Sequence, residues 1–269
     1  CTEMTYSVPA VESAIRLLNY LKANNNSQKS LAEACDALGI PRSSGFNIMK
    51  TLEKHGFVKF DRESKRYGLG WALVELGARA SEQMRYVEVV RPYLRTLGHS
   101  TGLTCVLTER VADQLVIVDK VESSNDIRVT ATVGQSYPLS AGALGKALMA
   151  YLSEQEIRSY VARKGLVAFT RYSITDVDAF MEELATVRRL GYAKSLEEYV
   201  QGVNVVASPV FGASTDVTLA VAALGLTSAL PADRIEEFGL KIVEVARQVT
   251  AALGGLWSDS GPQGATDAR

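Results

Sequence analysis

The residue types best suited to a chemical task lie in two short polar stretches in the first quarter of the chain. On one face of a helical pattern, the first stretch presents Arg42, Ser43, Ser44, Phe46, Asn47 and Lys50. The second is a charged segment between two short apolar runs, and its cations are Arg62, Lys65 and Arg66. Lysine and arginine neutralise phosphates, and an asparagine amide carries the donor and acceptor that pair with adenine in the major groove. This chemistry is that of double-stranded DNA recognition.

Catalytic chemistry finds no comparable support. The chain has two histidines, three widely spaced cysteines, no CxxC pair and no G-x-S-x-G motif. Residues 142–146 look like a phosphate-binding loop, but Ser140 stands where its first glycine is needed and Ala147 replaces the closing Ser or Thr. We therefore expect no enzyme activity, no catalytic residue, no bound metal and no cofactor.

A helix-turn-helix is predicted around the first polar stretch. Residues 8–23 have the apolar spacing of a helix with one buried face, made of Val11, Ala14, Ile15, Leu18 and Leu21. Ser30 and Glu33 have the spacing of a capping box, which predicts a second helix from Leu31. Gly39 can end that helix in the left-handed conformation, and Pro41 can open a third.

The third helix is expected to run to about His55 and to bury the face opposite its polar residues. Its inner face is predicted to contain Gly45, Ile48, Met49 and Leu52. Two short strands on either side of residues 61–66 predict a charged hairpin, or wing, and residues 71–85 a linker helix. This order is typical of a winged helix-turn-helix domain, which we place at residues 1–70.

Beyond residue 86 the pattern is mixed, so the fold class is predicted as α+β with a C-terminal α/β domain over residues 86–255. Strand-like runs cover residues 103–109, 114–121, 127–133, 203–211 and 217–224. Helical patterns cover residues 143–152, 154–163, 176–190 and 232–253. Residues 256–269 are rich in Gly, Ser, Asp and Pro, which predicts a disordered tail.

The charge is unevenly distributed. Residues 1–85 carry 12 Lys and Arg against 9 Asp and Glu, whereas residues 86–269 carry 17 against 21. A slightly basic module followed by an acidic one suits a DNA-binding head on a sensor domain. We find no signal segment and no apolar run that suits a membrane span, so we expect a cytoplasmic protein without a membrane partner.

From about residue 8 to residue 255 the chain resembles the IclR family of bacterial transcriptional regulators. In the first domain the resemblance is carried by residues 8–14 (VPAVESA), 38–44 (LGIPRSS) and 51–57 (TLEKHGF). In the second it is carried by residues 138–147 (PLSAGALGKA), 187–193 (VRRLGYA), 197–198 (EE), 202–203 (GV) and 207–210 (ASPV). The resemblance implies a GAF-like effector domain, a homodimer made through the DNA-binding domains, often a tetramer, and a palindromic DNA operator.

The resemblance also implies a small-molecule effector and a pocket for it. Its expected residues are Val129, Tyr137, Ala143, Leu144, Ser195, Val203, Val205, Ala223 and Gly225. Family members that bind small organic acids use the amides before the Gly-Lys pair, which here belong to Ala143 and Leu144 and would open a helix. They also use an acidic residue, a cysteine and two serines, for which this chain has serine, valine, alanine and glycine. We therefore expect an aromatic or otherwise apolar acid; the alternative is that this domain only oligomerises.

Two other classes of protein stay open. One is an enzyme or ligand-storage protein whose N-terminal helices only dimerise, and the other is a protein–protein adaptor. Salt-dependent binding to a promoter fragment distinguishes both from a regulator. Gly45 departs from the branched residue usual in the family, which predicts either a softer recognition helix or closer packing against its neighbour.

Overall fold

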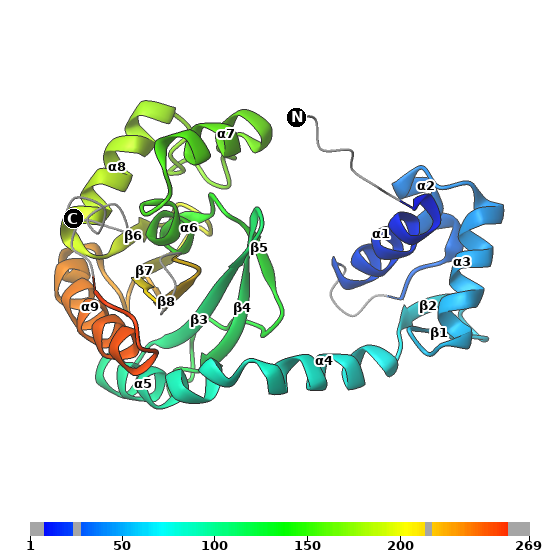
Figure 1. Ribbon diagram of the computed structural model, residues 1–269, viewed down its shortest axis with the longest axis horizontal. Helices are drawn as coiled ribbons and strands as arrows, with labels where there is room; N and C mark the ends of the chain where they lie inside the picture. Colours follow the sequence, from blue (N-terminus) through cyan, green and yellow to red (C-terminus); the bar gives the residue numbers. More distant parts are fainter. Residues whose placement is uncertain (1–7, 24–27, 213–216, 258–269) are drawn as a thin grey trace, which may run out of the picture. The chain divides into compact units, whose positions relative to one another are not determined.

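The computed structural model describes residues 8–23, 28–212 and 217–257, and these fall into two compact units, Cys1–Met84 and Arg85–Arg269 (Figure 1). Each unit has its own hydrophobic core. No helix in these ranges is long and apolar enough to cross a bilayer.

The first unit has the predicted winged helix-turn-helix order. Its elements are α1 (Pro9–Ala23), α2 (Leu31–Leu38), α3 (Arg42–Lys54), β1 (Val58–Asp61), β2 (Arg66–Leu69) and α4 (Ala72–Gln83). The strands β1 and β2 are antiparallel, and Lys29 adds a bridge to Tyr67 of β2. The core of this unit contains Leu17, Leu21, Ala34, Ile40, Met49, Val58 and Tyr67.

The predicted caps of α2 are confirmed. The Ser30 hydroxyl accepts a hydrogen bond from the Glu33 amide at 3.2 Å, and the Glu33 carboxylate accepts one from the Ser30 amide at 2.8 Å. Gly39 ends the helix with φ +64°, a left-handed conformation that costs glycine little. Pro41 then takes the N-cap position of α3.

The predicted buried face of α1 is partly wrong. Val11 and Ile15 are 55% and 51% exposed, whereas Leu17, which was not expected inside, is completely buried. On α1 the core begins only at Leu17 and includes Leu21. Apolar spacing identifies a stripe on a helix, but it does not show how far along the stripe the rest of the domain reaches.

The second unit is built on a six-stranded antiparallel sheet in the order β5-β4-β3-β8-β7-β6. The strands are β3 (Thr104–Val111), β4 (Gln114–Val121), β5 (Ser136–Pro138), β6 (Ala193–Leu196), β7 (Val203–Val210) and β8 (Leu219–Leu226). The helices are α5 (Arg85–Thr101), α6 (Gly142–Met149), α7 (Glu154–Lys164), α8 (Val177–Leu190) and α9 (Ile235–Ala252), with a 3₁₀ turn η1 at Ala232–Arg234. Antiparallel strands and separate helices confirm the α+β class.

The two faces of this sheet support different cores. Helices α5 and α9 lie side by side on one face, while α6, α7 and α8 lie across the other (Figure 1). Successive residues of a strand therefore join opposite cores: Val106 belongs with α6 to α8, and Cys105 with α5 and α9. The sheet leaves room for a cavity where its β4, β7 and β8 strands face the start of α6.

Two parts of the sequence prediction are corrected here. Residues 127–133 form no strand, and Ile127 is 80% exposed. The Val129 carbonyl accepts a hydrogen bond from the Thr104 hydroxyl rather than from a neighbouring strand. The short strands β5 and β6 were not expected, and no predicted range covered the helix α5. Of the expected tail at 256–269, residues 258–269 lie outside the described residues.

Candidate functional site

The polar stretch of α3 forms one solvent-facing surface. Its side chains Arg42, Ser43, Ser44, Phe46, Asn47 and Lys50 are all exposed. The opposite side of α3 packs inward, since Gly45 and Met49 are buried and Ile48 and Leu52 are half-buried. A helical period of 3.6 residues places Ser44 at the edge of the polar surface and the other five within it.

The cations of this surface pair only with exposed or half-exposed acids. The Lys50 ammonium lies 2.9 Å from the Glu53 carboxylate and within 5.9 and 5.5 Å of the ring centres of Phe46 and Phe60. Its hydrogen bond to Glu53 raises the pKa of Lys50, so the side chain stays charged. Arg42 lies 3.0 Å from Asp36, and both side chains are more than 60% exposed. Such surface pairs are weak, so phosphate oxygens can replace the acids.

The wing presents two of its three predicted cations to solvent. Arg62 and Lys65 are exposed at the tip, which Asp61 shapes by accepting hydrogen bonds from the Glu63 and Ser64 amides. The third cation, Arg66, is turned back: its guanidinium donates to the Gln28 carbonyl at 2.8 Å. Arg66 therefore joins β2 to the segment before α2, while Arg62 and Lys65 remain available.

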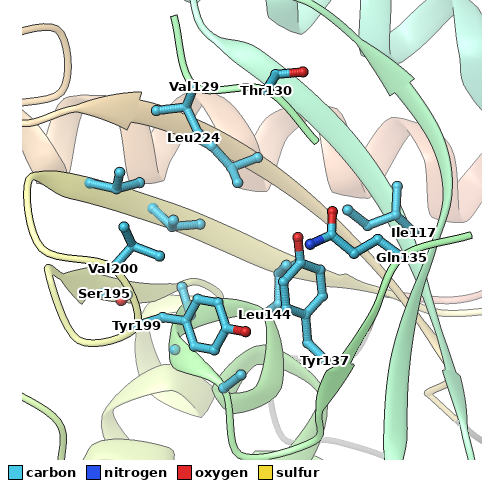
Figure 2. Close-up of a pocket in the computed structure, with 15 residues that line it drawn as sticks. Ile117, Val129, Thr130, Gln135, Tyr137, Leu144, Ser195, Tyr199, Val200 and Leu224 are labelled. Carbon is cyan, nitrogen blue, oxygen red and sulfur yellow. The ribbon is translucent and has the colours of Figure 1, made fainter. Parts of the chain in front are cut away.

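A cavity of about 280 Å³ lies in the second unit (Figure 2). Seven of the nine predicted effector residues line it: Val129, Tyr137, Ala143, Leu144, Ser195, Val203 and Val205. The structure thus brings together the loop after β4, the strands β5 to β7 and the start of α6. None of the lining residues, all of which are described, carries a charged side chain.

Ala223 and Gly225 do not reach this cavity. Ala223 belongs to the core under α5 and α9, and a Cβ on Gly225 would lie 2.8 Å from Leu103 on that same side. Leu224, between them on β8, lines the cavity and pairs with Val205 of β7. The cavity residue of β8 is therefore one position from the two expected ones, because in a strand a shift of one residue reverses the face.

The remaining lining residues were not anticipated from the sequence. Besides Leu224, they are Ile117, Thr130, Gln135, Ala141, Gly142, Tyr199 and Val200. Alternation along β4 is a signal for Ile117, because Leu115 and Ile117 lie on the same face. Tyr199 and Val200 follow β6 in an irregular segment, so no periodicity indicates where their side chains point.

The floor of the cavity combines a helix start with a buried hydroxyl. Helix α6 begins at Gly142 with φ +55°, and its N-cap residue Ala141 offers no side-chain acceptor to the first amides. Ser195 is 1% exposed, and its hydroxyl has no hydrogen-bond partner among the described residues. The two features adjoin, since a Cβ on Gly142 would lie 3.1 Å from the Ser195 Oγ. Free amides at a helix start attract anions, and the hydroxyl adds one more donor.

Just behind this floor, α6 carries a buried charge. Lys146 is 1% exposed, and its Nζ lies 2.7 Å from Glu198 and 3.1 Å from Glu183. Burial raises the pKa of Glu198, the nearby charge of Glu183 raises it further, and Lys146 opposes both. This trio ties α6 to α8 and to the segment that carries Tyr199.

The geometry of both surfaces suits binding. The α3 surface and the wing tip offer cations and an amide to a groove, and the cavity offers donors to a small anion. Within the described ranges, no three His, Cys, Asp or Glu side chains gather as metal ligands.

Comparison with known proteins gives consistent results for both units. The family model described as the IclR helix-turn-helix domain matches residues 10–62, and that of the bacterial transcriptional regulator IclR C-terminal region matches residues 78–251. Transcriptional repressor IclR of Escherichia coli K12 is 28% identical over 254 residues, which cover 94% of this chain and 92% of that protein. The repressor AllR of the same strain is 30% identical over 245 residues, covering 91% and 90%.

Solved structures agree with this assignment. An IclR transcriptional regulator from Alicyclobacillus acidocaldarius superimposes with a TM-score of 0.82 and 33% identity, covering 93% of this chain and all of that one. The IclR protein of Thermotoga maritima gives a TM-score of 0.69 and 26% identity, covering 91% and 99%.

Proposed function

Because this chain belongs to the IclR family of bacterial transcriptional regulators, we propose that it reads a palindromic operator and that a small-molecule effector controls this binding. In this proposal residues 1–70 form the DNA-binding domain, residues 71–85 the linker and residues 86–255 the effector domain. A palindromic operator is bound by a two-fold symmetric protein, so we expect a homodimer or a tetramer. We place this protein in the cytoplasm.

The exposed polar surface of α3 is the observation that carries the DNA part of the proposal. Asn47 is suited to an adenine edge, and Arg42 to a guanine or a phosphate. Ser43 and Ser44 sit near the start of α3, where short hydroxyls reach the sugar-phosphate backbone. Phe46 and Lys50 extend this surface, and Arg62 and Lys65 of the wing reach the neighbouring backbone or minor groove. Arg66 supports the wing.

Binding to the upstream DNA of the protein's own gene, measured over a salt series, tests this part. We expect protection of a palindrome and an affinity that falls steeply with salt, because each neutralised phosphate releases counterions. Equal and weak binding to unrelated DNA would contradict the proposal and favour an adaptor or a ligand-storage protein.

The floor of the cavity carries the effector part of the proposal. A carboxylate fits against the first amides of α6 and the Ser195 hydroxyl, and the Val203, Val205 and Leu224 side chains provide apolar walls. The cavity of about 280 Å³ approaches the lower end of the range for drug-sized ligands, so a two- or three-carbon acid would leave much of it empty. We therefore propose an aromatic or otherwise apolar acid as effector.

Thermal shift of the full chain against short aliphatic and aromatic acids tests the effector class. We expect the aromatic acids to raise the melting temperature, since a ligand that binds only the folded state stabilises it. A shift with the short acids alone would overturn this part and leave the DNA-binding proposal standing.

A further inference from the structure

The cavity has a buried end and an open end. Ser195, Ala143 and the start of α6 are buried at the floor, whereas Thr130 and Gln135 are exposed at the mouth. Figure 2 shows Ser195 and Gln135 on opposite sides of the lining. A ligand whose carboxylate lies at the floor therefore directs its far end away from Ser195, towards the side of Tyr137 and Gln135.

Two tyrosines stand between floor and mouth. The rings of Tyr137 and Tyr199 meet edge to face, with centres 5.3 Å apart and planes at 82°. Phe169 packs on Tyr199 with ring centres 4.6 Å apart, which holds that side chain in place. In Figure 2 the Tyr199 hydroxyl points towards the Tyr137 side of the cavity. Neither hydroxyl has a hydrogen-bond partner in the described part of the chain.

Both phenols are neutral donors at physiological pH. Burial raises the pKa of Tyr137 to about 12, with a smaller contribution from nearby Tyr199. Burial also raises the pKa of Tyr199. A neutral phenol donates a hydrogen bond to an acceptor. A second anion at this end would meet no cation among the lining residues.

We propose that Tyr137 and Tyr199 determine ligand specificity by selecting a flat ring acid that carries one carboxylate and, at its far end, one neutral hydrogen-bond acceptor. This inference rests on the proposed effector function of the cavity. The first amides of α6 and Ser195 hold the carboxylate, the apolar strand residues cover the ring, and the phenols donate to the acceptor. A second carboxylate is rejected because it would be desolvated without a partner charge.

Calorimetric titration of the full chain with benzoate, 4-hydroxybenzoate and terephthalate tests the proposal. These acids share the ring and one carboxylate and differ only in the para group, which is a hydrogen, a neutral hydroxyl or a second carboxylate. We expect 4-hydroxybenzoate to bind roughly three- to ten-fold more tightly than benzoate, the gain of about one hydrogen bond. Terephthalate is expected to bind more weakly than either.

The variants Tyr137→Phe and Tyr199→Phe separate recognition from packing. Each keeps the ring and loses the hydroxyl, so we expect 4-hydroxybenzoate to lose much more affinity than benzoate and its advantage over benzoate to shrink. Tyr172→Phe, at a tyrosine 43% exposed and outside the cavity lining, is the control and should change neither affinity.

Three outcomes would overturn the inference. Equal wild-type affinities for benzoate and 4-hydroxybenzoate would do so, as would equal losses for both acids in the phenylalanine variants; in both cases the effector function survives. If none of the three acids binds, the proposed aromatic effector is contradicted as well, whereas operator binding is measured separately.

Ser195→Ala should weaken the binding of benzoate and of 4-hydroxybenzoate by the same factor, because both acids place their carboxylate at the floor.

Discussion

Gly45 of α3 faces Cys35 of α2 so closely that a Cβ atom on the glycine would overlap the cysteine sulfur. The same Cβ would lie 3.6 Å from Leu31 Cδ1 and 3.8 Å from Ile40 Cγ2, which are ordinary contacts. Cys35 is 1% exposed, so its sulfur would have to be displaced within the core. Of the two expectations for Gly45, the structure therefore favours close packing: the glycine lets the two helices of the helix-turn-helix approach each other.

Gly45→Ala is expected to lower the free energy of unfolding by ~1–3 kcal/mol, because one methyl group must displace a buried sulfur. Alanine would otherwise stabilise the interior of a helix. The double variant Gly45→Ala/Cys35→Ala removes the overlapping atom and should recover most of the loss. Urea unfolding of the four proteins in this cycle measures the coupling.

Gly77→Ala in α4 is the matched control. Nothing lies within 4 Å of a Cβ at Gly77, and the residue is exposed, so we expect ~0.5–1 kcal/mol of stabilisation from helix propensity. A stabilised Gly45→Ala protein would contradict the packing argument and return the recognition helix to the softer alternative.

Lys146→Met is expected to destabilise the second unit by ~3–5 kcal/mol. The lysine neutralises the Glu183 and Glu198 carboxylates, whose side chains are only 20% and 15% exposed, and its loss leaves both without a partner charge. The triple variant with Glu183→Gln and Glu198→Gln should regain most of the stability, because it contains no unpaired buried charge. Urea unfolding followed by circular dichroism distinguishes the two; a triple variant as unstable as the single one would show that packing of the lysine stem matters instead.

Glu198 predicts a particular dependence of stability on pH. Its pKa in the folded protein is raised above the ordinary value of 4.5, first by burial and then by Glu183. The folded state therefore favours the protonated carboxyl, so this contribution to stability is complete below pH 4.5 and is lost as the pH rises through the folded-state pKa.

Relative to Glu198→Gln, which does not titrate, the wild-type protein should lose stability as the pH is raised from 4 to 7. Unfolding free energies of both proteins at each pH give the difference directly. A difference that stays constant would show that Lys146 balances burial at this site, and one that grows in favour of the wild type would show that Lys146 outweighs it.

The features that the sequence alone predicted well are determined by neighbours in the chain. The capping box of Ser30 and Glu33 and the left-handed Gly39 involve residues at most a few positions apart, so their spacing is sufficient evidence. The polar surface of α3 follows from helical period within one element in the same way. The winged helix-turn-helix and the residues proposed to contact DNA could therefore be read before the structure.

The features that were missed depend on distant parts of the chain. The choice between Ala223 and Leu224 as a cavity residue follows from the pairing of β8 with β7 and β3, which no local pattern of this all-apolar strand reveals. Tyr199 points into the cavity because Phe169, 30 positions earlier, packs on its ring.

The two kinds of contact proposed on α3 predict different losses of DNA affinity: one independent of the DNA sequence and one specific to the operator. Lys50→Ala removes a phosphate contact, so affinity should fall by a similar factor on operator and unrelated DNA, and the salt slope should decrease by about one. Asn47→Ala removes a base contact, which should cost ~1–3 kcal/mol on the operator and relax the preference at one base pair of each half-site. Filter binding to the operator, to single-base variants and to unrelated DNA, each over a salt series, measures both quantities.

Arg158→Ala provides the control for these variants, because it removes an exposed cation of the second unit that pairs with Glu154 one helical turn earlier. It should leave both the affinity and the salt slope unchanged. If Asn47→Ala weakens all DNA equally, Asn47 positions the backbone and the base reading lies elsewhere on α3, with Arg42 the next residue to test. If Lys50→Ala leaves the salt slope intact, the lysine stays with Glu53 in the complex, and the phosphate contacts come from the wing tip.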